Sequence, residues 1–544
     1  MAKCCKPLIA GWLLPGVIAS GLLLLIALSA FGALWFNNTW FNNVWLNAPE
    51  SHWQTFLSDS YLWHVIGFTF WQAFLSALFS VIPAIFLARA LYRRHFPGRT
   101  LFLRLCAMTL VLPVLVALFG ILTVYGRIGW LAHLCQWIGI EYRFTPYGLQ
   151  GILLAHIFFN MPMATRLLLQ SLEGIAVEQR QLAAQLGMNE WQHFRFVEWP
   201  YLRRQILPTA ALIFMLCFAS FAAVLALGGG PSATTIELAI YQAIKYDYDL
   251  GQAALLALIQ LFCCLGLVLL SQKLKGVLSV GYGHQQQWRN PQDSWLKKLC
   301  DGLLITTALL FLLPPLLAVI VDGLNSAAFD VLSKPALWQA FTTSIIIAPG
   351  AGFLCVLLTM MLLWSSRELR LRHLSRWGQA MESSGLLILA MPGIVLATGF
   401  FILLNNTVGL PDSPYELIIL TNALMAIPYA LKVLDNPMRD LAERYNPLCR
   451  SLNIQGVHRL RWIELKALRI PLAQALAFAS VLSIGDFGVV ALFGNENFRT
   501  LPFYLYQQIG AYRSQDGAVT AFLLLLLCFI LFSVLERLPG RRHD

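Results

Sequence analysis

Charged side chains are scarce in this chain, and their scarcity excludes an ordinary soluble protein. Asp, Glu, Lys and Arg make up only 12% of the 544 residues, whereas 58% are hydrophobic. A soluble domain carries about 25% charged residues. Because the apolar blocks extend from one end of the sequence to the other, the composition indicates an integral membrane protein rather than a soluble domain with one anchor.

Sequence signals of metal binding and catalysis are also missing. The 11 cysteines lie mostly inside apolar blocks and show neither zinc-ligand spacing nor a secreted disulfide framework. No Gly-x-x-x-x-Gly-Lys-Ser/Thr motif occurs, and the glycines at 228–230 lack the lysine of a phosphate-binding loop. We therefore expect no metal site, no catalytic residues and no cofactor bound by this chain, and we do not expect an enzyme.

Long apolar runs are what the sequence has instead. A membrane-spanning helix needs about 20 apolar residues, and only a helix satisfies all of its own backbone polar groups in lipid. The sequence therefore predicts an all-α membrane fold of about twelve spanning helices. They lie at residues 10–35, 62–88, 102–124, 148–169, 207–228, 252–271, 299–321, 338–364, 384–404, 415–434, 472–493 and 518–536.

Lys and Arg are distributed unequally between the two sides of these spans. Of 38 basic residues, only six fall in the odd-numbered turns: Arg127, Arg143, Lys245, Lys334, Arg499 and Arg513. By the positive-inside rule, both termini are predicted to be cytoplasmic. The net charge of +11 is then a topology signal. We therefore expect the lipid bilayer, and not nucleic acid, as the partner of the chain.

The two halves of the chain repeat each other in parallel orientation. Proline landmarks recur in order, with Pro113 and Pro162 in the first half and Pro392 and Pro428 in the second. Both halves start and end inside, which predicts repeats related by an axis along the membrane normal. The predicted division is a first repeat at 1–272 with a polar loop at about 173–204, a cytoplasmic linker at 273–298, and a second repeat at 299–544 with a polar loop at about 439–470.

The two polar loops carry the same pattern, once in each half. The first reads Gln181-Leu-Ala-Ala-Gln-Leu-Gly187, then nine residues, then Val197-Glu-Trp-Pro200; the second reads Pro447-Leu-Cys-Arg-Ser-Leu-Asn453, then nine residues, then Ile463-Glu-Leu-Lys466. Each predicts a polar helix–turn–helix between two spans. Such an element is suited to docking, so its duplication predicts two copies of a cytoplasmic partner.

The residue types suit these turns. Gly187 is expected to end the first helix in the left-handed conformation, and Asn453 can replace it in the second loop. Asn189 is expected to cap the next helix. The apolar stripe that follows leaves two alternatives open for Phe194 and Val197, which either meet the partner or pack on the chain's own spans.

The loops resemble the signature of ABC importer permeases, which reads Glu-Ala-Ala, three residues, Gly, nine residues, then Ile-x-Leu-Pro. Gly187 and Pro200 keep this spacing, whereas Gln181 departs from it and the second loop has drifted further. The resemblance implies a coupling helix that contacts an ATPase subunit. The residues implied are Gln181, Ala183, Gly187, Trp191, Phe194, Ser451, Asn453, Val457 and Leu460.

Two further segments narrow the resemblance. Ser483-Ile-Gly-Asp-Phe-Gly488 and the run from Phe498 to Gln508 are most similar to thiamine permeases within the fused ferric-iron and thiamine branch. This resemblance implies a type I ABC importer-like fold and a role as the permease subunit of an ATP-driven importer of thiamine and its phosphates. It places the chain in the bacterial inner membrane, with two copies of a separate ABC ATPase that uses ATP-Mg and a periplasmic substrate-binding protein.

Two other functions stay open at this point. A ferric-iron importer permease belongs to the same branch. An ion-coupled secondary transporter also has twelve spans in two parallel halves, but it usually needs several intramembrane ionisable groups and has no use for two docking loops.

Asp486 is the one acidic residue in the middle of a predicted span, where an ionisable group costs at least about 2.5–3.5 kcal/mol. It can attract a cationic substrate with help from aromatic rings. Permeases for oxyanions resemble this segment with Glu in its place, which favours a structural or gating role. His156, Asn160 and Asn422 are further candidates for the substrate path, although such groups more often bond helix to helix.

Overall fold

The structure is a computed structural model that describes residues 9–36, 59–109, 111–274, 295–388, 391–407, 409, 411, 413–454, 456–495 and 498–537. No β-strand occurs within these ranges. They contain ten helices long and apolar enough to cross a membrane, and an eleventh span if the bent pair Leu460–Ala467 and Arg469–Gly485 counts as one. The prediction of an all-helical membrane fold is confirmed. Most of the predicted linker, residues 275–294, lies outside the described residues.

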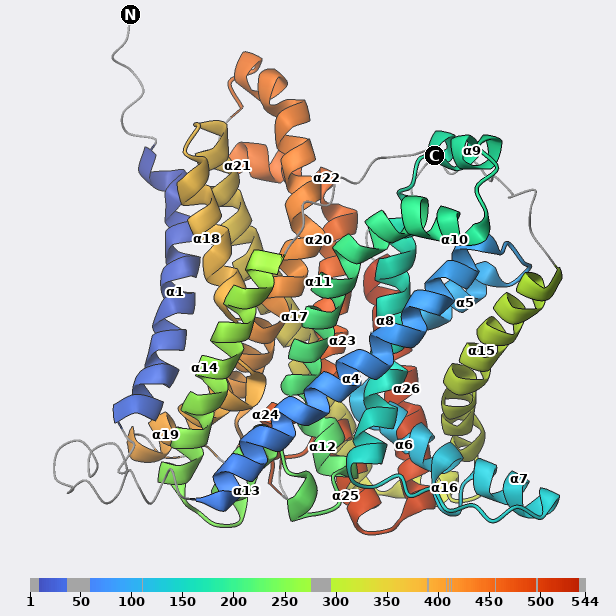
Figure 1. Ribbon diagram of the computed structural model, residues 1–544. Coiled ribbons are helices and arrows are strands. Elements are labelled where there is room, and N and C mark those ends of the chain that lie inside the picture. The colour runs from blue at the N-terminus through green and yellow to red at the C-terminus, as the bar shows by residue number, and fades with distance from the viewer. Residues whose placement is uncertain are drawn as a thin grey trace, which may run out of the picture. The chain divides into compact units, whose positions relative to one another are not determined.

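One compact unit comprises residues 59–238 and 263–324. Its long helix α4 (Ser60–Arg93) packs along α8 (Leu149–Glu173) and α11 (Trp199–Phe218), as Figure 1 shows. Helix α15 (Trp295–Gly323) packs on α4 and α6. The other elements of this unit are α5 (Arg99–Met108), α6 (Val114–Tyr125), α7 (Trp130–Ile138), α9 (Val177–Gln185), α10 (Glu190–His193), the π-helical turn η2 (Phe194–Glu198), α12 (Phe221–Leu227) and η3 (Pro231–Ala233).

The second compact unit comprises residues 1–58, 239–262 and 325–544. Its centre is α17 (Pro335–Leu371), which packs against α20 (Tyr415–Ser451) and α23 (Arg469–Gly485) and against the N-terminal helix α1 (Ile9–Phe36). It also holds α16 (Ala328–Ser333), α18 (Ser375–Leu387), α19 (Gly393–Thr407), α21 (Gly456–Arg459), η5 (Leu460–Glu464), α22 (Leu465–Ala467), α24 (Gly488–Phe493), α25 (Leu501–Gly510) and α26 (Ser514–Arg537). Two helices cross the sequence boundaries of the units, α13 (Ile236–Lys245) and α14 (Leu250–Leu274).

The compact units do not coincide with the predicted sequence repeats. Helix α1 belongs to the first repeat by sequence, yet it packs on α17, α18 and α19 of the second. The fit is close, because a Cβ added to Gly399 of α19 would come within 2.8 Å of Ala30 of α1. Small residues of this kind let membrane helices approach closely. The repeat boundaries themselves stay a prediction from the sequence.

Four predicted spans are broken rather than continuous, and for these the prediction was wrong. The spans at 102–124 and 384–404 are interrupted just before Pro113 and Pro392, because the residue before a proline is disfavoured in the helical conformation. Those at 207–228 and 472–493 are interrupted at residues 219–220 and 486–487. Ser220 and Asp486 lie at these breaks, and such side chains compete for backbone hydrogen bonds.

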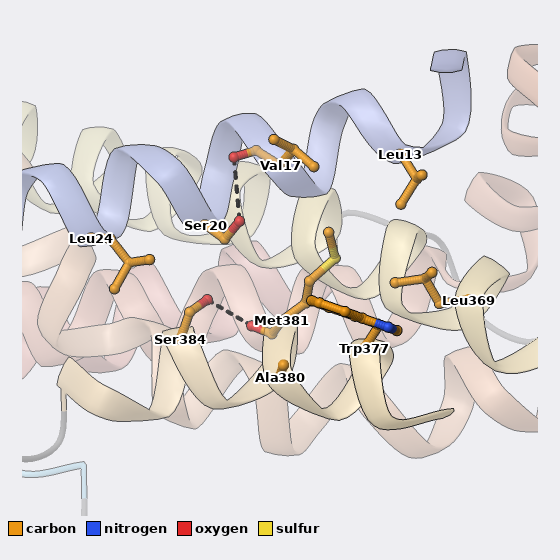
Figure 2. Close-up of a pocket in the computed structure, with 9 residues that line it drawn as sticks. All are labelled: Leu13, Val17, Ser20, Leu24, Leu369, Trp377, Ala380, Met381 and Ser384. Atoms are coloured by element: carbon orange, nitrogen blue, oxygen red, sulfur yellow. Dashed lines mark hydrogen bonds between the residues drawn. The ribbon is translucent and has the colours of Figure 1, made fainter. Parts of the chain in front are cut away.

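A pocket of about 410 Å³ lies between α1, α17 and α18 (Figure 2). Most of its lining is apolar, and its two serines are occupied within their own helices. Ser20 Oγ donates to the Val17 carbonyl at 3.3 Å, and Ser384 Oγ donates to the Met381 carbonyl at 2.7 Å. The residues that line the pocket carry no charged group, and their polar side-chain atoms are the two serine hydroxyls and the Trp377 indole nitrogen, so the pocket has no charge that could select an ionic substrate.

Candidate functional site

The polar loop at about 173–204 has the turn chemistry that its sequence predicted, and we call it and the polar loop at about 439–470 the first and second coupling loops, after the signature that they resemble. Gly187 follows α9 with a φ of 64°, which confirms the left-handed conformation expected there. Asn189 Oδ1 accepts a hydrogen bond from the backbone N–H of Gln192, and the Gln192 side chain accepts one from the N–H of Asn189, each at 2.9 Å. This reciprocal capping box starts α10 and confirms the predicted cap.

Apolar side chains lie exposed on this loop. Trp191 is 66% exposed, and Gln181 and Gly187 are exposed beside it, whereas Ala183 is buried. Sequence reasoning missed three further exposed members, Leu182, Leu186 and Phe196. We call Leu182, Leu186, Trp191 and Phe196 the first coupling surface. Exposed apolar patches on a soluble face mark interaction sites.

Phe194 and Val197 pack inward, which resolves the alternative left open by the sequence. Val197 is buried and Phe194 is half-buried. The Arg89 guanidinium of α4 lies over the Phe194 ring, 4.1 Å from its centroid. Both side chains therefore pack on the chain's own spans, and of the aromatic stripe only Trp191 and Phe196 remain largely open.

The second coupling loop repeats this design with different residues. Asn453 takes a φ of 52°, as predicted for the counterpart of Gly187. Ser451 and Asn453 are exposed, and Leu460 is half-buried. Val457 lies in α21, but its side chain falls outside the described part of the chain. The helix before the turn is not separate, because α20 continues to Ser451 through Pro447.

The exposed apolar side chains recur in register between the loops. When Asn453 is aligned with Gly187, the exposed Leu448, Leu452 and Trp462 fall opposite Leu182, Leu186 and Phe196. We call Leu448, Leu452 and Trp462 the second coupling surface. The sequence does show these apolar residues at matching positions of the two loops. They were missed because the family signature is defined by the small and polar residues between them.

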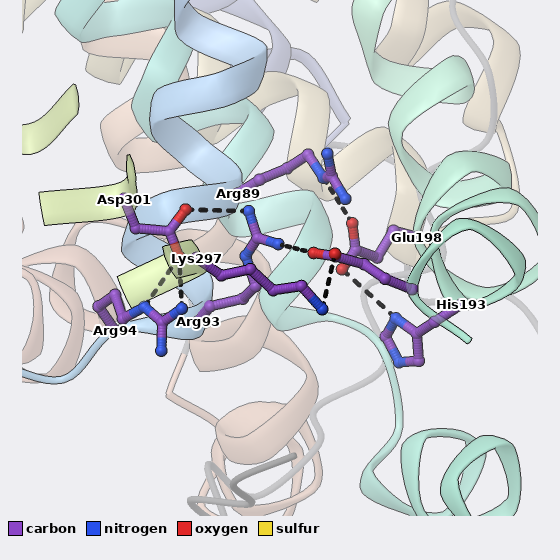
Figure 3. Close-up of polar contacts among 8 residues, drawn as sticks. Arg89, Arg93, Arg94, His193, Glu198, Lys297 and Asp301 are labelled. Carbon is purple, nitrogen blue, oxygen red and sulfur yellow. Dashed lines mark hydrogen bonds and ion pairs between the residues drawn. The ribbon is translucent and has the colours of Figure 1, made fainter. Parts of the chain in front are cut away.

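A buried ion pair ties each loop to a long helix. Arg89 Nε of α4 lies 2.6 Å from Glu198 Oε2, at the end of η2 (Figure 3). Arg367 of α17 pairs with Glu464 at the end of η5. The side chains of Glu198 and Glu464 are 4% and 0% exposed, so neither carboxylate can exchange its partner for water. The two glutamates occupy equivalent positions when the loops are aligned.

Each of the two glutamates also has a second basic side chain close to its carboxylate. His193 Nδ1 lies 3.4 Å from Glu198 Oε1, and Arg459 Nε lies 2.8 Å from Glu464 Oε1. A π-helical turn carries the acid in both loops. Single π-helical turns of this kind occur often at functional sites.

The first loop has a second set of ion pairs that joins α10 to α4 and α15. Glu190 lies 2.7 Å from Arg93 Nη1 and 2.8 Å from Lys297 Nζ. Asp301 in turn pairs with Arg93 at 3.1 Å and with Arg94 at 2.8 Å. In the aligned second loop, Gly456 stands at the position of Glu190, so this acid has no counterpart there.

The predicted polar residues of the first half bond helix to helix. His156 Nδ1 lies 2.8 Å from Ser76 Oγ, and its Nε2 lies 2.9 Å from Ser220 Oγ at the break between α11 and α12. Asn160 Nδ2 donates to Cys217 Sγ at 3.2 Å. Both side chains are buried, and both hold the broken helix against α8.

The second half has an equivalent cluster at the break between α23 and α24. Asn422 Nδ2 donates to Ser483 Oγ at 2.9 Å. The Asp486 carboxylate interacts with the backbone N–H groups of Gly488 and Val489 in the first turn of α24, whose N-cap position is occupied by Phe487. The Oδ2 atom of Asp486 is buried without a partner among the described residues.

The two clusters occupy equivalent positions in the two halves but use different contacts. In the alignment that pairs the coupling loops, Asn422 falls at the position of His156, and Asp486 falls at the position of Ser220. In each half, one of these residues lies on the helix before the loop and the other lies at the helix break after it.

Comparison with known proteins gives a consistent assignment. The family described as "Binding-protein-dependent transport system inner membrane component" matches residues 80–273. The thiamine transport system permease protein of Escherichia coli strain K12 is 69% identical over 541 residues, which cover 99% of each chain. The corresponding proteins of Haemophilus influenzae and Brucella suis are 43% and 41% identical, over 90% and 89% of each chain.

These relatives cover nearly the whole sequence, including both coupling loops and both broken helices. A relative with another printed substrate, a probable sulfate transport system permease protein of Marchantia polymorpha, is 27% identical over only 193 residues. The chain therefore belongs to the family of binding-protein-dependent ABC transport permeases that these thiamine transport system permease proteins represent.

Proposed function

We propose that this chain is the membrane-spanning subunit of an ATP-driven importer that carries thiamine and its phosphates into the bacterial cytoplasm. The observation that carries the proposal is the identity of 69% over 99% of the chain to a permease named for thiamine transport. The chain is a multi-pass transport subunit and not an enzyme. The relatives give no support to the ferric-iron alternative, and the two coupling loops argue against a secondary transporter.

Membership of this family implies an ATPase and a substrate-binding protein as partners. We propose that two ATPase copies dock, one on the first and one on the second coupling surface. The ATPase would use ATP-Mg, and this chain would bind no cofactor. Both termini would then lie in the cytoplasm, with the substrate-binding protein on the opposite, periplasmic side.

The buried ion pairs suggest how movement of the ATPase reaches the spans. Removing one partner of a buried pair leaves an uncompensated charge, which costs about 3–5 kcal/mol. Arg89–Glu198 and Arg367–Glu464 should therefore stay closed through the transport cycle. Each loop would then move with α4 or α17 as one body.

The broken helices are the proposed hinges of the substrate path. His156 and Asn160 hold the α11–α12 break, while Asn422 and Asp486 hold the α23–α24 break. A buried carboxylate that interacts with the first turn of a helix supports gating more than recognition of substrate charge. We therefore propose a gating role for these four residues.

The proposed substrate can be tested in proteoliposomes that contain this chain, its ATPase and its substrate-binding protein. Labelled thiamine should accumulate only when ATP-Mg is present on the ATPase side. Accumulation that continues without the ATPase would contradict the importer mechanism. Uptake of ferric iron in place of thiamine would favour the other branch of the family.

The coupling role of the first loop can be tested with Gly187→Val. A left-handed conformation costs a β-branched residue about 1–2 kcal/mol, and a Cβ at Gly187 meets no other atom within 4 Å. We therefore expect the spans to fold and the ratio of thiamine transported to ATP hydrolysed to fall about tenfold, equivalent to about 1.4 kcal/mol.

Gly139→Val is the matched control for this prediction. Gly139 also follows a helix, with a φ of 80° and no atom within 4 Å of an added Cβ, but it ends α7 and lies in neither loop. The same backbone strain there should leave the ratio unchanged. Equal losses in the two variants would mean that strain alone, and not the loop, causes the effect.

Two substitutions at Asp486 separate its contacts with the first turn of α24 from its charge. Asp486→Asn keeps an oxygen that can accept the N–H bonds of Gly488 and Val489, whereas Asp486→Ala removes it. Loss of a side chain that accepts hydrogen bonds at the start of a helix costs about 1 kcal/mol, so uptake should slow about fivefold in Asp486→Ala. Asp486→Asn should retain most uptake, and both variants should still bind the ATPase in a pull-down. An equal loss in both variants would assign the role to the negative charge instead.

A further inference from the structure

Two tyrosines have a left-handed backbone conformation just before corresponding helices of the two halves. Tyr248 lies two residues before α14 begins, and Tyr512 lies two residues before α26 begins. Their φ angles are 55° and 57°, in the left-handed region that bulky residues rarely adopt. We call these two residues the tyrosine pair.

Only Tyr512 lies at a helix end of the kind that favours glycine, whereas Tyr248 lies one residue further beyond its helix. The N–H of Arg513, which follows Tyr512, donates to the Gln508 carbonyl at 3.0 Å, as in a Schellman motif. The N–H of Asp249, which follows Tyr248, donates to the Ala243 carbonyl at 2.9 Å. Glycine is usual at such a position, since any side chain strains the left-handed backbone.

Packing within the chain does not compensate for this strain. Tyr248 is 82% exposed and Tyr512 is 93% exposed. Backbone hydrogen bonds hold each turn in this conformation, while the exposed rings add little packing within the chain, which leaves them available to an external partner. The strain is moreover duplicated, once in each half of the sequence.

We propose that the tyrosine pair is the docking surface for the soluble substrate-binding protein. This inference rests on the proposed function, which places such a partner opposite the ATPase. In Figure 1, the turns before α14 and α26 lie at the end of their unit opposite α21, which follows the second coupling turn. Tyrosine suits this role because it buries a large ring at low entropic cost and often supplies the binding energy of an interface.

Neighbouring charges define the chemistry that the partner must offer. Tyr248 stands between Asp247 and Asp249, which are both exposed. Tyr512 is followed by the exposed Arg513, while the nearby Asp516 is neutralised by Lys334 at 2.7 Å. The partner should therefore present a basic patch to the first turn and an acidic patch to the second. Opposite charges at the two turns would fix the orientation of docking.

The same charges argue against the bilayer as the occupant. Aromatic rings do anchor membrane proteins at the headgroup level. However, Asp247 and Asp249 on either side of Tyr248 would be repelled by anionic headgroups, and an anchoring ring does not require a strained backbone.

The test exchanges each tyrosine for glycine in the assembled permease–ATPase complex. Tyr248→Gly and Tyr512→Gly relieve backbone strain and remove the ring, so each should raise the melting temperature of the complex. Each should also raise, by about tenfold, the concentration of substrate-binding protein that half-maximally stimulates ATP hydrolysis. A residue with only a structural role would not change stability and docking in opposite directions.

Phe329→Ala is the control, because Phe329 is 86% exposed in the regular helix α16 of the same unit. It should change neither quantity. Higher melting temperatures with unchanged half-stimulating concentrations would overturn the docking role. Lower melting temperatures in lipid, again with unchanged half-stimulating concentrations, would show anchoring in the membrane and would also overturn it. A wild-type complex that the binding protein does not stimulate would overturn the proposed function as well, so the two failures are distinguishable.

Discussion

The structure depends on a buried arginine–glutamate pair that is built twice. Arg89 and Glu198 join α4 to the first coupling loop, and Arg367 and Glu464 join α17 to the second. The glutamates are almost fully buried, so the pairs are far stronger constraints than exposed ion pairs, which contribute about 0–1 kcal/mol. The proposed coupling depends on these pairs, because a polar loop can transmit movement to a span only if it is fixed to that span.

The two halves share this pair but differ in what surrounds it. Glu190 connects the first loop to Arg93 and Lys297, and so links α10 to α15. Gly456 occupies the equivalent position in the second loop and cannot do this. The second loop is held by other contacts, from Arg459 to Glu464 at 2.8 Å and to Asn446 of α20 at 3.2 Å. At the α11–α12 and α23–α24 breaks, His156, Asn160 and Asn422 hold one helix against another, whereas one carboxylate oxygen of Asp486 has no partner among the described residues.

Much of this architecture could be predicted from the sequence. Apolar length located the spans, and the left-handed turns at Gly187 and Asn453 and the cap at Asn189 followed from residue type. The breaks at Pro113 and Pro392 were missed because hydropathy is averaged over a window of residues. Such an average does not detect that a single proline disfavours the helical conformation of the residue before it. The ion pairs were missed because residues as distant in sequence as Arg89 and Glu198 meet only when the helices pack. The tyrosine pair left no signal in composition, since its meaning lies in its backbone angles.

The central claim is that the buried pairs transmit ATP-driven movement from the loops to the spans. The most direct measurement is the number of thiamine molecules transported per ATP hydrolysed in proteoliposomes, compared between wild type, Glu198→Gln and the charge-reversed double variant Arg89→Glu/Glu198→Arg. We predict that Glu198→Gln lowers this ratio while the ATPase stays bound, and that charge reversal restores part of it. An unchanged ratio in Glu198→Gln, with normal uptake, would contradict the claim.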